Sequence, residues 1–346
     1  MAHGEDTLRE IKDQPRIWTE VVAATASLGK ELGIALTRAE GIILTGCGSA
    51  LNVAFCASPI LQRFTGIDAR AIPAADMFQF PEACIPRNRK PLVVTISRSG
   101  ETTETVLARR AASERGCTTI SLTCFDGTMS READLSVVLT CCQEKSVCTT
   151  NSVTGMILAL QWMAATNDKN FRAELEDLPE LGEKLIAPSI ALGEMLGNDD
   201  RINKYAFIGS GPFYGIAREC QLKIKEMTLL PSDSYPLMDY RHGPNSNVDM
   251  HMLITMLCSD SGRQWERECA DELMRYGGQL LVISNSPVLG KHTSELYLHC
   301  DLSEYARGPL YLPIVQSMAA TKALRLGMDP DNPRNLSYWV KTKALQ

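Results

Sequence analysis

The stretch Leu92-Val-Val-Thr-Ile-Ser-Arg-Ser-Gly-Glu-Thr-Thr-Glu-Thr-Val106 decides the fold of this chain. Its residues from Leu92 to Ile96 are aliphatic or β-branched without polar alternation, which is typical of a strand buried on both faces of a parallel sheet. Small hydroxyl residues and a glycine follow, and then a helical pattern begins. The stretch therefore predicts a strand, a tight loop and a helix.

The loop in this stretch has the composition of an anion site. The first N–H groups of a helix lack intrahelical partners, and the helix dipole favours negative charge there. Gly100 permits close approach of the backbone and Arg98 adds positive charge, while three hydroxyls come from Ser97, Ser99 and Thr102. These residues favour a phosphate site. The same hydroxyls also serve as a plain helix cap, so the segment alone leaves both interpretations open.

Composition sets the class of protein. The 346 residues are 45% hydrophobic and 22% charged with a net charge of −6, which argues against disorder and against a nucleic-acid partner. The twelve cysteines show no CxxC pair and no zinc-type Cys/His spacing, so we expect reduced thiols, no metal and no cofactor. The polar N-terminus and the absence of a long apolar run predict a soluble, cytoplasmic protein without a membrane partner.

The order of elements predicts a parallel, doubly wound α/β sheet. Two helices separated at Pro15 are expected in residues 5–38. Apolar strands then alternate with helices, which is the pattern of a parallel sheet. The expected strands are residues 41–45, 68–72, 92–96, 118–123 and 134–139. The turn at residues 46–49 lacks the third glycine and the later acidic residue of a dinucleotide fingerprint, so a nicotinamide cofactor is not expected.

The pattern returns in the second half of the chain. Residues 205–211 repeat residues 42–48 at an offset of 163 (209 − 46), and residues 253–262 repeat the stretch around Gly100 at an offset of 162 (262 − 100). We interpret this as two copies of one α/β unit. The second copy has Asp260 in its loop, and a carboxylate there repels a phosphate by roughly 1 to 4 kcal/mol at a few ångströms. One phosphate site per chain is therefore expected, in the first copy.

Two groups in the second copy are suited to proton transfer. Glu219, Lys223 and Glu226 follow at i, i+4 and i+7, so they share one face of a helix that starts at a sheet edge. A solvated charged stripe is the plainer interpretation. His242 lies in a loop with Gly243 and Pro244, and histidine is a common general acid or base, although a surface histidine explains it equally well.

A series of motifs resembles the SIS (sugar isomerase) family, and within it the isomerase half of glucosamine-6-phosphate synthase and its deaminase relatives. The matching segments are residues 8–15, 46–50, 96–102, 145–150, 219–226, 241–244 and 333–337. The resemblance implies an α/β fold of two tandem SIS domains, each a flavodoxin-like three-layer αβα sandwich around a parallel sheet.

It also implies a domain order. The expected parts are N-terminal helices (1–38), a phosphate-binding SIS domain (39–166), a helical connector (167–203), a second SIS domain with the catalytic helix (204–330) and a C-terminal tail over the active site (331–346).

The resemblance assigns roles to single residues. Glu226 is implied to move a proton between C1 and C2 of the sugar, Lys223 to stabilise charge on the sugar oxygens, and His242 to assist ring opening from the neighbouring subunit of a homodimer. The implied ligands of the sugar phosphate are Ser97, Arg98, Ser99, Thr102, Cys47, Gly48, Ser49, Ala50, Val147, Thr149 and Ser337.

Two departures from the synthase bear on the activity. Tyr338 stands where the synthase has a lysine, with Lys341 three residues on, which argues against a Schiff base. The sequence begins directly at the isomerase-like segment, so no ammonia from glutamine is expected. We therefore predict a deaminase that converts glucosamine 6-phosphate to fructose 6-phosphate and ammonia. A fructosamine-6-phosphate deglycase or another phosphosugar aldose/ketose isomerase is the alternative, and a non-catalytic phosphosugar sensor, which needs neither Glu226 nor His242, is a second.

Overall fold

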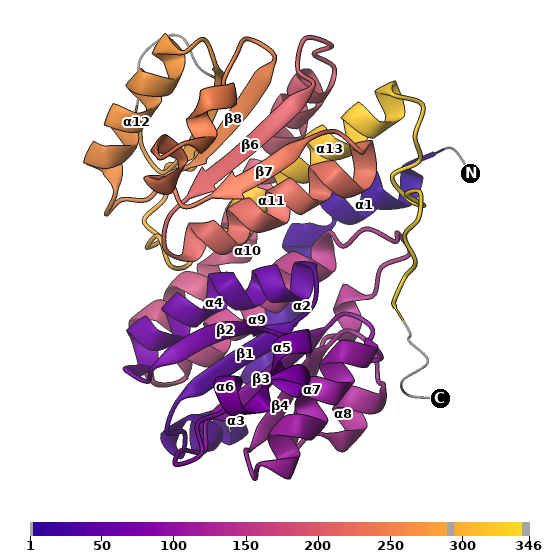
Figure 1. The fold of residues 1–346 in the computed structure, drawn as a ribbon, viewed down its shortest axis with the longest axis vertical. Coiled ribbons are helices and arrows are strands. Elements are labelled where there is room, and N and C mark those ends of the chain that lie inside the picture. The colour runs from indigo at the N-terminus through magenta and orange to yellow at the C-terminus, as the bar shows by residue number, and fades with distance from the viewer. Residues whose placement is uncertain (1–2, 289–293, 341–346) are drawn as a thin grey trace.

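Two five-stranded parallel sheets form the framework of the protein (Figure 1). The computed structural model describes residues 3–288 and 294–340. The first sheet has the order β2 (Ala69–Pro73), β1 (Ile42–Gly46), β3 (Leu92–Ser97), β4 (Thr119–Thr123), β5 (Leu135–Val138). The second has the order β7 (Ser232–Tyr235), β6 (Lys204–Gly209), β8 (Met252–Leu257), β9 (Gln279–Ser284), β10 (Ser294–Tyr297). All their strand pairs are parallel.

Thirteen α-helices are present in the described part of the chain. They are α1 (Glu5–Lys12), α2 (Gln14–Ala26), α3 (Gly29–Thr37), α4 (Ser49–Thr65), α5 (Ala74–Gln79), α6 (Pro81–Cys84), α7 (Thr103–Glu114), α8 (Thr128–Glu132), α9 (Asn151–Ala164), α10 (Lys169–Gly197), α11 (Pro212–Thr228), α12 (Arg263–Arg275) and α13 (Leu312–Arg325). The expectation of two helices before the first strand was wrong, because α3 is separate. The first break falls at Asp13, so that Pro15 lies in the first turn of α2, where it needs no N–H partner.

Each sheet is buried on both faces, as the unbroken apolar strands indicate. Along β3, Val94 and Ile96 face a core shared by both halves of the chain, while Val93 faces a smaller core beneath α5, α6 and α7. In the second sheet, Phe207 of β6 faces the shared core and Ile208 faces a cluster beneath α12. This alternation gives a helix, sheet, helix layering in each half, and the shared core joins the two halves into one body.

The two sheets have the same connectivity. Each follows the 2-1-3-4-5 strand order of flavodoxin-like sheets when its strands are numbered in chain order. The turns after the first strand of each copy also match, because Gly48 has φ 56° and Gly211 has φ 57°. An L-residue with a side chain rarely adopts this conformation. The two copies therefore share both topology and a specialised turn.

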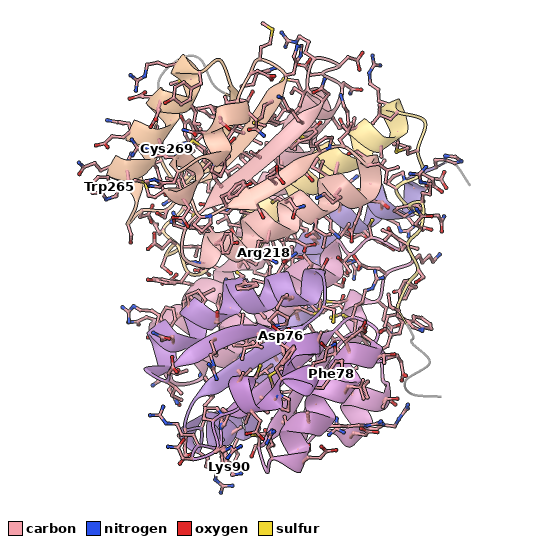
Figure 2. All side chains as sticks on the ribbon, viewed as in Figure 1. Asp76, Phe78, Lys90, Arg218, Trp265 and Cys269 are labelled. Carbon is pink, nitrogen blue, oxygen red and sulfur yellow. The ribbon has the colours of Figure 1, made fainter. Side chains whose placement is uncertain are left out.

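Helices α4 and α11 pack against each other where the two halves meet. A Cβ atom on Gly215 would lie 2.6 Å from the Cα of Cys56 and 2.7 Å from the carbonyl of Asn52, so only glycine allows this approach. Nearby, Arg218 donates from Nε to Asn52 Oδ1 (3.1 Å) and covers the Phe55 ring, and Figure 2 shows it between the halves. The crossing brings the start of α4 and the face of α11 together.

Replacing Gly215 by alanine is expected to destabilise the protein. The added methyl group overpacks a helix crossing whose nearest atoms are backbone, which costs about 1 to 3 kcal/mol or more. Urea unfolding should show this loss, with a lower midpoint and an unchanged slope. Gly29→Ala is the matched control, since no atom lies within 4 Å of its Cβ position. Equal midpoints for the two variants would contradict the role given to the crossing.

The last described residues return to the first half of the chain. After α13 the tail runs down one side of the molecule, past α1 (Figure 1). Val147 donates its N–H to the carbonyl of Asp331 (3.0 Å), and the Asp331 carboxylate accepts from both the N–H and the hydroxyl of Thr7. The tail is therefore tied to the first half. No helix among residues 3–288 and 294–340 has the length and apolar character needed to cross a bilayer.

Candidate active site

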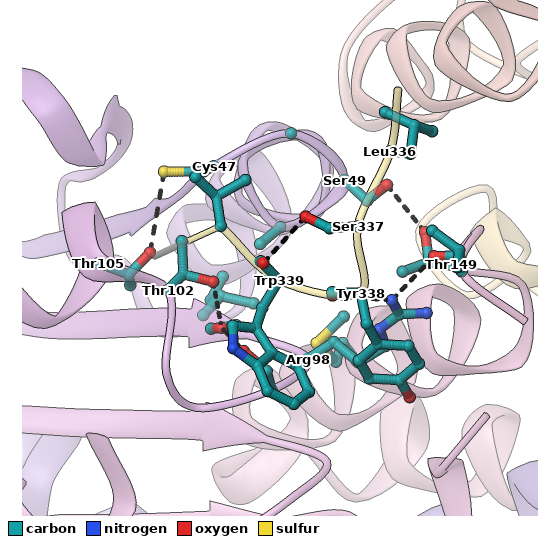
Figure 3. A pocket seen from close by; sticks show the side chains of 18 of the residues that line it. Cys47, Ser49, Arg98, Thr102, Thr105, Thr149, Leu336, Ser337, Tyr338 and Trp339 are labelled. Atoms are coloured by element: carbon teal, nitrogen blue, oxygen red, sulfur yellow. Dashed lines mark hydrogen bonds between the residues drawn. The ribbon is translucent and has the colours of Figure 1, made fainter. Parts of the chain in front are cut away.

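A cavity of about 250 Å³ opens between the carboxyl ends of β1 and β3, the helix α11 and the tail (Figure 3). Twelve residues singled out from the sequence line it: Cys47, Gly48, Ser49, Ala50, Ser97, Arg98, Ser99, Thr102, Val147, Thr149, Glu226 and Ser337. The fold thus brings together segments from five separate parts of the chain. Parallel sheets bind ligands at the carboxyl ends of their strands, and this cavity has that position.

The loop between β3 and α7 presents clustered hydroxyls to the cavity. Ser97 Oγ lies 3.0 Å from Thr102 Oγ1 and 3.4 Å from Ser99 Oγ. Gly100 has φ 70°, and its N–H donates to Ser97 Oγ (3.3 Å). The hydroxyls stand at the N-terminus of a 12-residue helix, where the dipole favours an anion. The geometry suits a phosphate group.

Arg98 belongs to this loop, but its guanidinium bonds to protein acceptors. Its Nη1 donates to the carbonyl of Ser146 (3.1 Å) and lies 3.4 Å from Glu144 Oε2. Its Nη2 donates to the carbonyls of Val147 (2.8 Å) and Tyr338 (3.2 Å). The side chain is 7% exposed. Arg98 lines the cavity, while its donors hold neighbouring segments of chain.

Three charged residues of α11, namely Glu219, Lys223 and Glu226, form a buried ion-pair chain rather than a solvated stripe. Lys223 Nζ lies 2.6 Å from Glu226 Oε2 and 3.3 Å from Glu219 Oε1. The side chains of Lys223 and Glu219 are 1% and 2% exposed, whereas Glu226 is 19% exposed and lines the cavity. Glu226 is therefore the carboxylate that a bound molecule can reach.

Hydrogen bonds join this ion-pair chain to the first half of the protein. Ser49 Oγ and Asn52 Nδ2 donate to Glu219 (3.0 and 2.9 Å), and Lys223 Nζ donates to Thr149 Oγ1 (2.9 Å). Burial raises the pKa of the Glu219 carboxyl. Burial by itself would lower the pKa of Lys223, but the two carboxylates outweigh it and raise that pKa above its ordinary value. Lys223 is held as a cation beside the cavity.

The corresponding loop of the second copy is filled by the protein itself. Glu304 accepts from the N–H groups of Asp260 (2.7 Å) and Ser261 (3.1 Å) and from the Ser261 hydroxyl. Asp260 in turn pairs with the fully buried Arg307, at 2.7 Å. The loop also lacks a left-handed glycine, since Gly262 has φ −93°. Its donors are already taken by a carboxylate.

His242 does not lie at the cavity. It follows a short 3-10 helix (Asp239–Arg241), is exposed, and is absent from the cavity lining. Lys341 lies outside the described residues. Among the described residues, no cluster of three His, Cys, Asp or Glu side chains is arranged to hold a metal ion. Burial raises the pKa of the Cys47 thiol, so this residue meets the cavity as a neutral group.

The segment over the cavity, residues 144–150, rests on buried carboxylates. Glu10 accepts from the N–H of Lys145 (2.7 Å), and Glu144 accepts from the N–H and hydroxyl of Thr150 (both 2.7 Å). Burial, together with the nearby Glu144 carboxylate, raises the pKa of Glu10 to about 7. The support of this segment therefore includes a group that titrates near neutrality.

A pH dependence of stability follows from Glu10. Because its pKa is raised from 4.5 in the unfolded chain to about 7, the folded state holds the proton more tightly. The contribution of protonated Glu10 to the free energy of unfolding is complete below pH 4.5 and is lost as the pH rises to about 7. Unfolding free energies measured across that range should fall more steeply for the native protein than for Glu10→Gln. Glu5→Gln, at an exposed position of the same helix, should keep the native slope. Parallel slopes for native and Glu10→Gln would rule out the titration.

Several cavity residues carried no sequence signal. Leu336, Trp339 and Val340 line it from the irregular tail, and Thr105 and Met156 line it from helices where they look like ordinary packing residues. Asn52 was missed as well, although a polar residue at a buried helical position one turn after the first glycine turn is the kind of signal that could have found it.

Comparison with known proteins identifies the first half of the chain. Residues 35–166 match the sequence model of the SIS domain. This stretch is similar to an SIS domain. The resemblance noted from the motifs is thereby confirmed, and the matched stretch contains the hydroxyl loop, the glycine turn and the segment over the cavity.

Curated relatives extend the similarity beyond the SIS domain. The chain is 26% identical over 341 residues to glutamine–fructose-6-phosphate aminotransferase (isomerizing) of Aquifex aeolicus, which covers 96% of this chain and 57% of that protein. The same enzyme of Campylobacter jejuni is 27% identical over 356 residues, with the same coverage. The chain thus spans little more than half the length of these relatives.

Solved structures share the fold of the whole chain. Glucosamine-6-phosphate deaminase from Thermotoga maritima is 24% identical with a TM-score of 0.77, covering 97% of this chain and 99% of its own. Tagatose-6-phosphate ketose/aldose isomerase from Escherichia coli is 24% identical with a TM-score of 0.87, covering 95% of each chain. The C-terminal domain of glucosamine-fructose-6-phosphate aminotransferase from Francisella tularensis is 20% identical with a TM-score of 0.80, covering 96% and 99%. The arrangement of two sheets is common to all of them.

Proposed function

We propose that this chain is an aminosugar-phosphate deaminase that converts glucosamine 6-phosphate to fructose 6-phosphate and ammonia. The observation that carries the proposal is that one cavity contains both the hydroxyl loop at the start of α7 and the reachable carboxylate Glu226, with Lys223 beside it. A phosphosugar isomerase needs a group of donors that binds the phosphate and a base that moves a proton between two sugar carbons. The names of the similar proteins, which include phosphosugar isomerases and a deaminase, support the same class.

The mechanism assigns one step to each group. Glu226 removes the proton from C2 of the ring-opened amino sugar and returns it to C1, which one base can do on one face of an enolamine. The Lys223 cation stabilises the negative charge that develops on the sugar oxygen. The oxygen on C1 gains a proton and the nitrogen on C2 loses one, so the product is an imine at C2. Water adds to that carbon and ammonia leaves, giving fructose 6-phosphate. This direction needs only water as the second reactant, which is why we place it first.

The reaction as proposed uses the nitrogen of the substrate and no Schiff base with the protein. Tyr338, at the position where the synthase has a lysine, lines the cavity with an aromatic ring. Among the residues that line the cavity in the described part of the chain there is no lysine, and the nearby Lys223 is held between two carboxylates.

The test is release of ammonia from purified protein supplied with glucosamine 6-phosphate, with fructose 6-phosphate measured in parallel. Equal amounts of both products are expected. Ammonia without fructose 6-phosphate, or neither product, would exclude the proposed reaction. Fructosamine 6-phosphates then provide the second substrate, since the same base serves a deglycase.

We also propose that residues 204–330 are a second SIS domain and that the enzyme is a homodimer. The repeated strand order and the matching glycine turns support the first statement. His242 is exposed and outside the cavity of its own chain, which supports its contribution to the cavity of a partner subunit. We propose the other parts of the chain with the same bounds as in the sequence analysis: N-terminal helices (1–38), a phosphate-binding SIS domain (39–166), a helical connector (167–203) and a C-terminal tail (331–346).

Complementation between two inactive variants tests the shared site. Glu226→Gln and His242→Ala are each expected to be inactive as homodimers. Coexpressed in equal amounts, they should recover about one quarter of native activity, because half of the dimers are mixed and each mixed dimer has one intact site. Activity no higher than the mean of the two homodimers would place His242 in its own chain's site or outside catalysis.

A further inference from the structure

Tyr338 anchors the tail at the edge of the cavity through contacts on three sides. Its ring centroid lies 3.9 Å from the Arg98 guanidinium carbon, its hydroxyl donates to the Glu144 carbonyl (2.6 Å), and its own carbonyl accepts from Arg98 Nη2 (3.2 Å). Figure 3 shows Tyr338 beside Arg98. The ring of Phe125 meets Tyr338 edge-on at 6.0 Å. Within a tail of mostly exposed residues, Tyr338 is half-buried.

Arg98 links the same point to the segment over the cavity. It donates to the carbonyls of Ser146 and Val147 and lies 3.4 Å from the fully buried Glu144 carboxylate. An arginine satisfies several acceptors in one plane, and its face stacks on an aromatic ring, where the quadrupole attracts a cation. Every one of these acceptors belongs to the protein. The guanidinium thus links two segments, residues 144–147 and the tail, to the loop that carries Arg98.

We propose that Arg98 and Tyr338 form a clasp that closes the tail and the 144–147 segment over the cavity, and that both are positioning residues rather than phosphate ligands. The phosphate is then bound by the hydroxyls of Ser97, Ser99 and Thr102 and by the N-terminus of α7. The effect of the clasp on turnover rests on the proposed function, whereas its effect on the tail does not.

The experiment uses the full chain in four single variants and in the double variant that combines Tyr338→Ala with Arg98→Gln. Tyr338→Ala removes the ring and the hydroxyl, Tyr338→Phe removes the hydroxyl alone, Arg98→Gln removes the cation, and Arg110→Gln is the control, an exposed arginine of α7 paired with Glu132. Tyr338→Ala leaves the buried Arg98 and Glu144 side chains in place, so we expect this variant to fold. It therefore still tests the clasp if Arg98→Gln does not fold. Circular dichroism verifies each variant.

Three measurements separate the possible roles. Trypsin cleavage after the exposed Arg334 is expected to be about tenfold faster in Tyr338→Ala and Arg98→Gln, because the open tail is accessible. Affinity for inorganic phosphate should stay within about threefold of native in both, since neither side chain is a ligand. Turnover of glucosamine 6-phosphate should fall about 10²-fold in kcat/KM, with the double variant within about threefold of the worse single one, because the two act as a unit. The cleavage rate, the phosphate affinity and the kcat/KM of Tyr338→Phe should each lie between the values of the native protein and of Tyr338→Ala.

The outcomes are distinct. A tenfold or greater loss of phosphate affinity confined to Arg98→Gln would make Arg98 a phosphate ligand and overturn the clasp. Native rates of cleavage after Arg334 in both variants would overturn it as well. If native protein releases no ammonia, yet cleavage and phosphate binding change as described, the proposed function fails and the clasp stands.

Discussion

Glu226→Gln is expected to lower turnover by about 10²- to 10⁴-fold while the protein stays folded and continues to bind the sugar phosphate. The amide has nearly the same shape as the carboxylate but cannot accept the proton that must leave the sugar carbon. The kcat of the proposed reaction should therefore fall much more than the KM changes. Exchange of the C2 proton with solvent deuterium, followed by NMR, should fall by the same factor.

The control for this variant is Glu268→Gln on the exposed face of α12, which should leave turnover unchanged. A Glu226→Gln protein with more than about a tenth of native turnover would show that another group moves the proton. Retained ligand binding with lost turnover also separates an enzyme from a phosphosugar sensor, because a sensor has no use for the proton transfer.

Lys223→Met is expected to be the most destabilising single change at the site. It removes the cation between Glu219 and Glu226 and leaves a fully buried carboxylate without its charge partner. Breaking a buried pair in this way costs about 3 to 5 kcal/mol. Burial already raises the pKa of Glu219, so without the cation the loss of stability should grow as the pH rises and that carboxyl is forced to ionise.

Chemical unfolding at pH 6 and pH 8 measures this effect. Lys225→Met, two residues along the same helix but exposed, is the matched control and should change stability little. If the two methionine variants unfold alike, the buried ion-pair chain does not hold α11 in place.

The fold followed from the sequence where strands are buried on both faces. Short, β-branched aliphatic runs such as those of β3 and β8, each followed by a glycine-containing loop, are typical of strands buried on both faces. The repeated glycine turns predicted that the second half has the same order of elements as the first. The edge strands β7 and β10 were not predicted. Ser232–Tyr235 and Ser294–Tyr297 are short and partly exposed, so they lack the apolar pattern that marks a central strand.

The site was predictable in its residues and less so in its contacts. The hydroxyls of the loop and the face of α11 follow from local spacing. The partners of Arg98 do not, because Tyr338 lies 240 residues away in sequence and only the folded tail brings them together. Glu304 in the second loop is a similar case: local sequence revealed the unfavourable Asp260, but not the carboxylate that occupies the loop from 43 residues away.

The crossing of α4 and α11 at Gly215 has a consequence for the length of the molecules that fit. The loop proposed to bind the phosphate is carried by the first sheet, and Glu226, the proposed base, is carried by a helix of the second half, so the distance between them depends on how the two halves pack. A five-carbon and a six-carbon phosphate differ by one carbon between the phosphate and the reacting bond. On the proposed function, we expect the helix crossing to set which sugar length reacts, so that Gly215 contributes to this selection although it does not line the cavity.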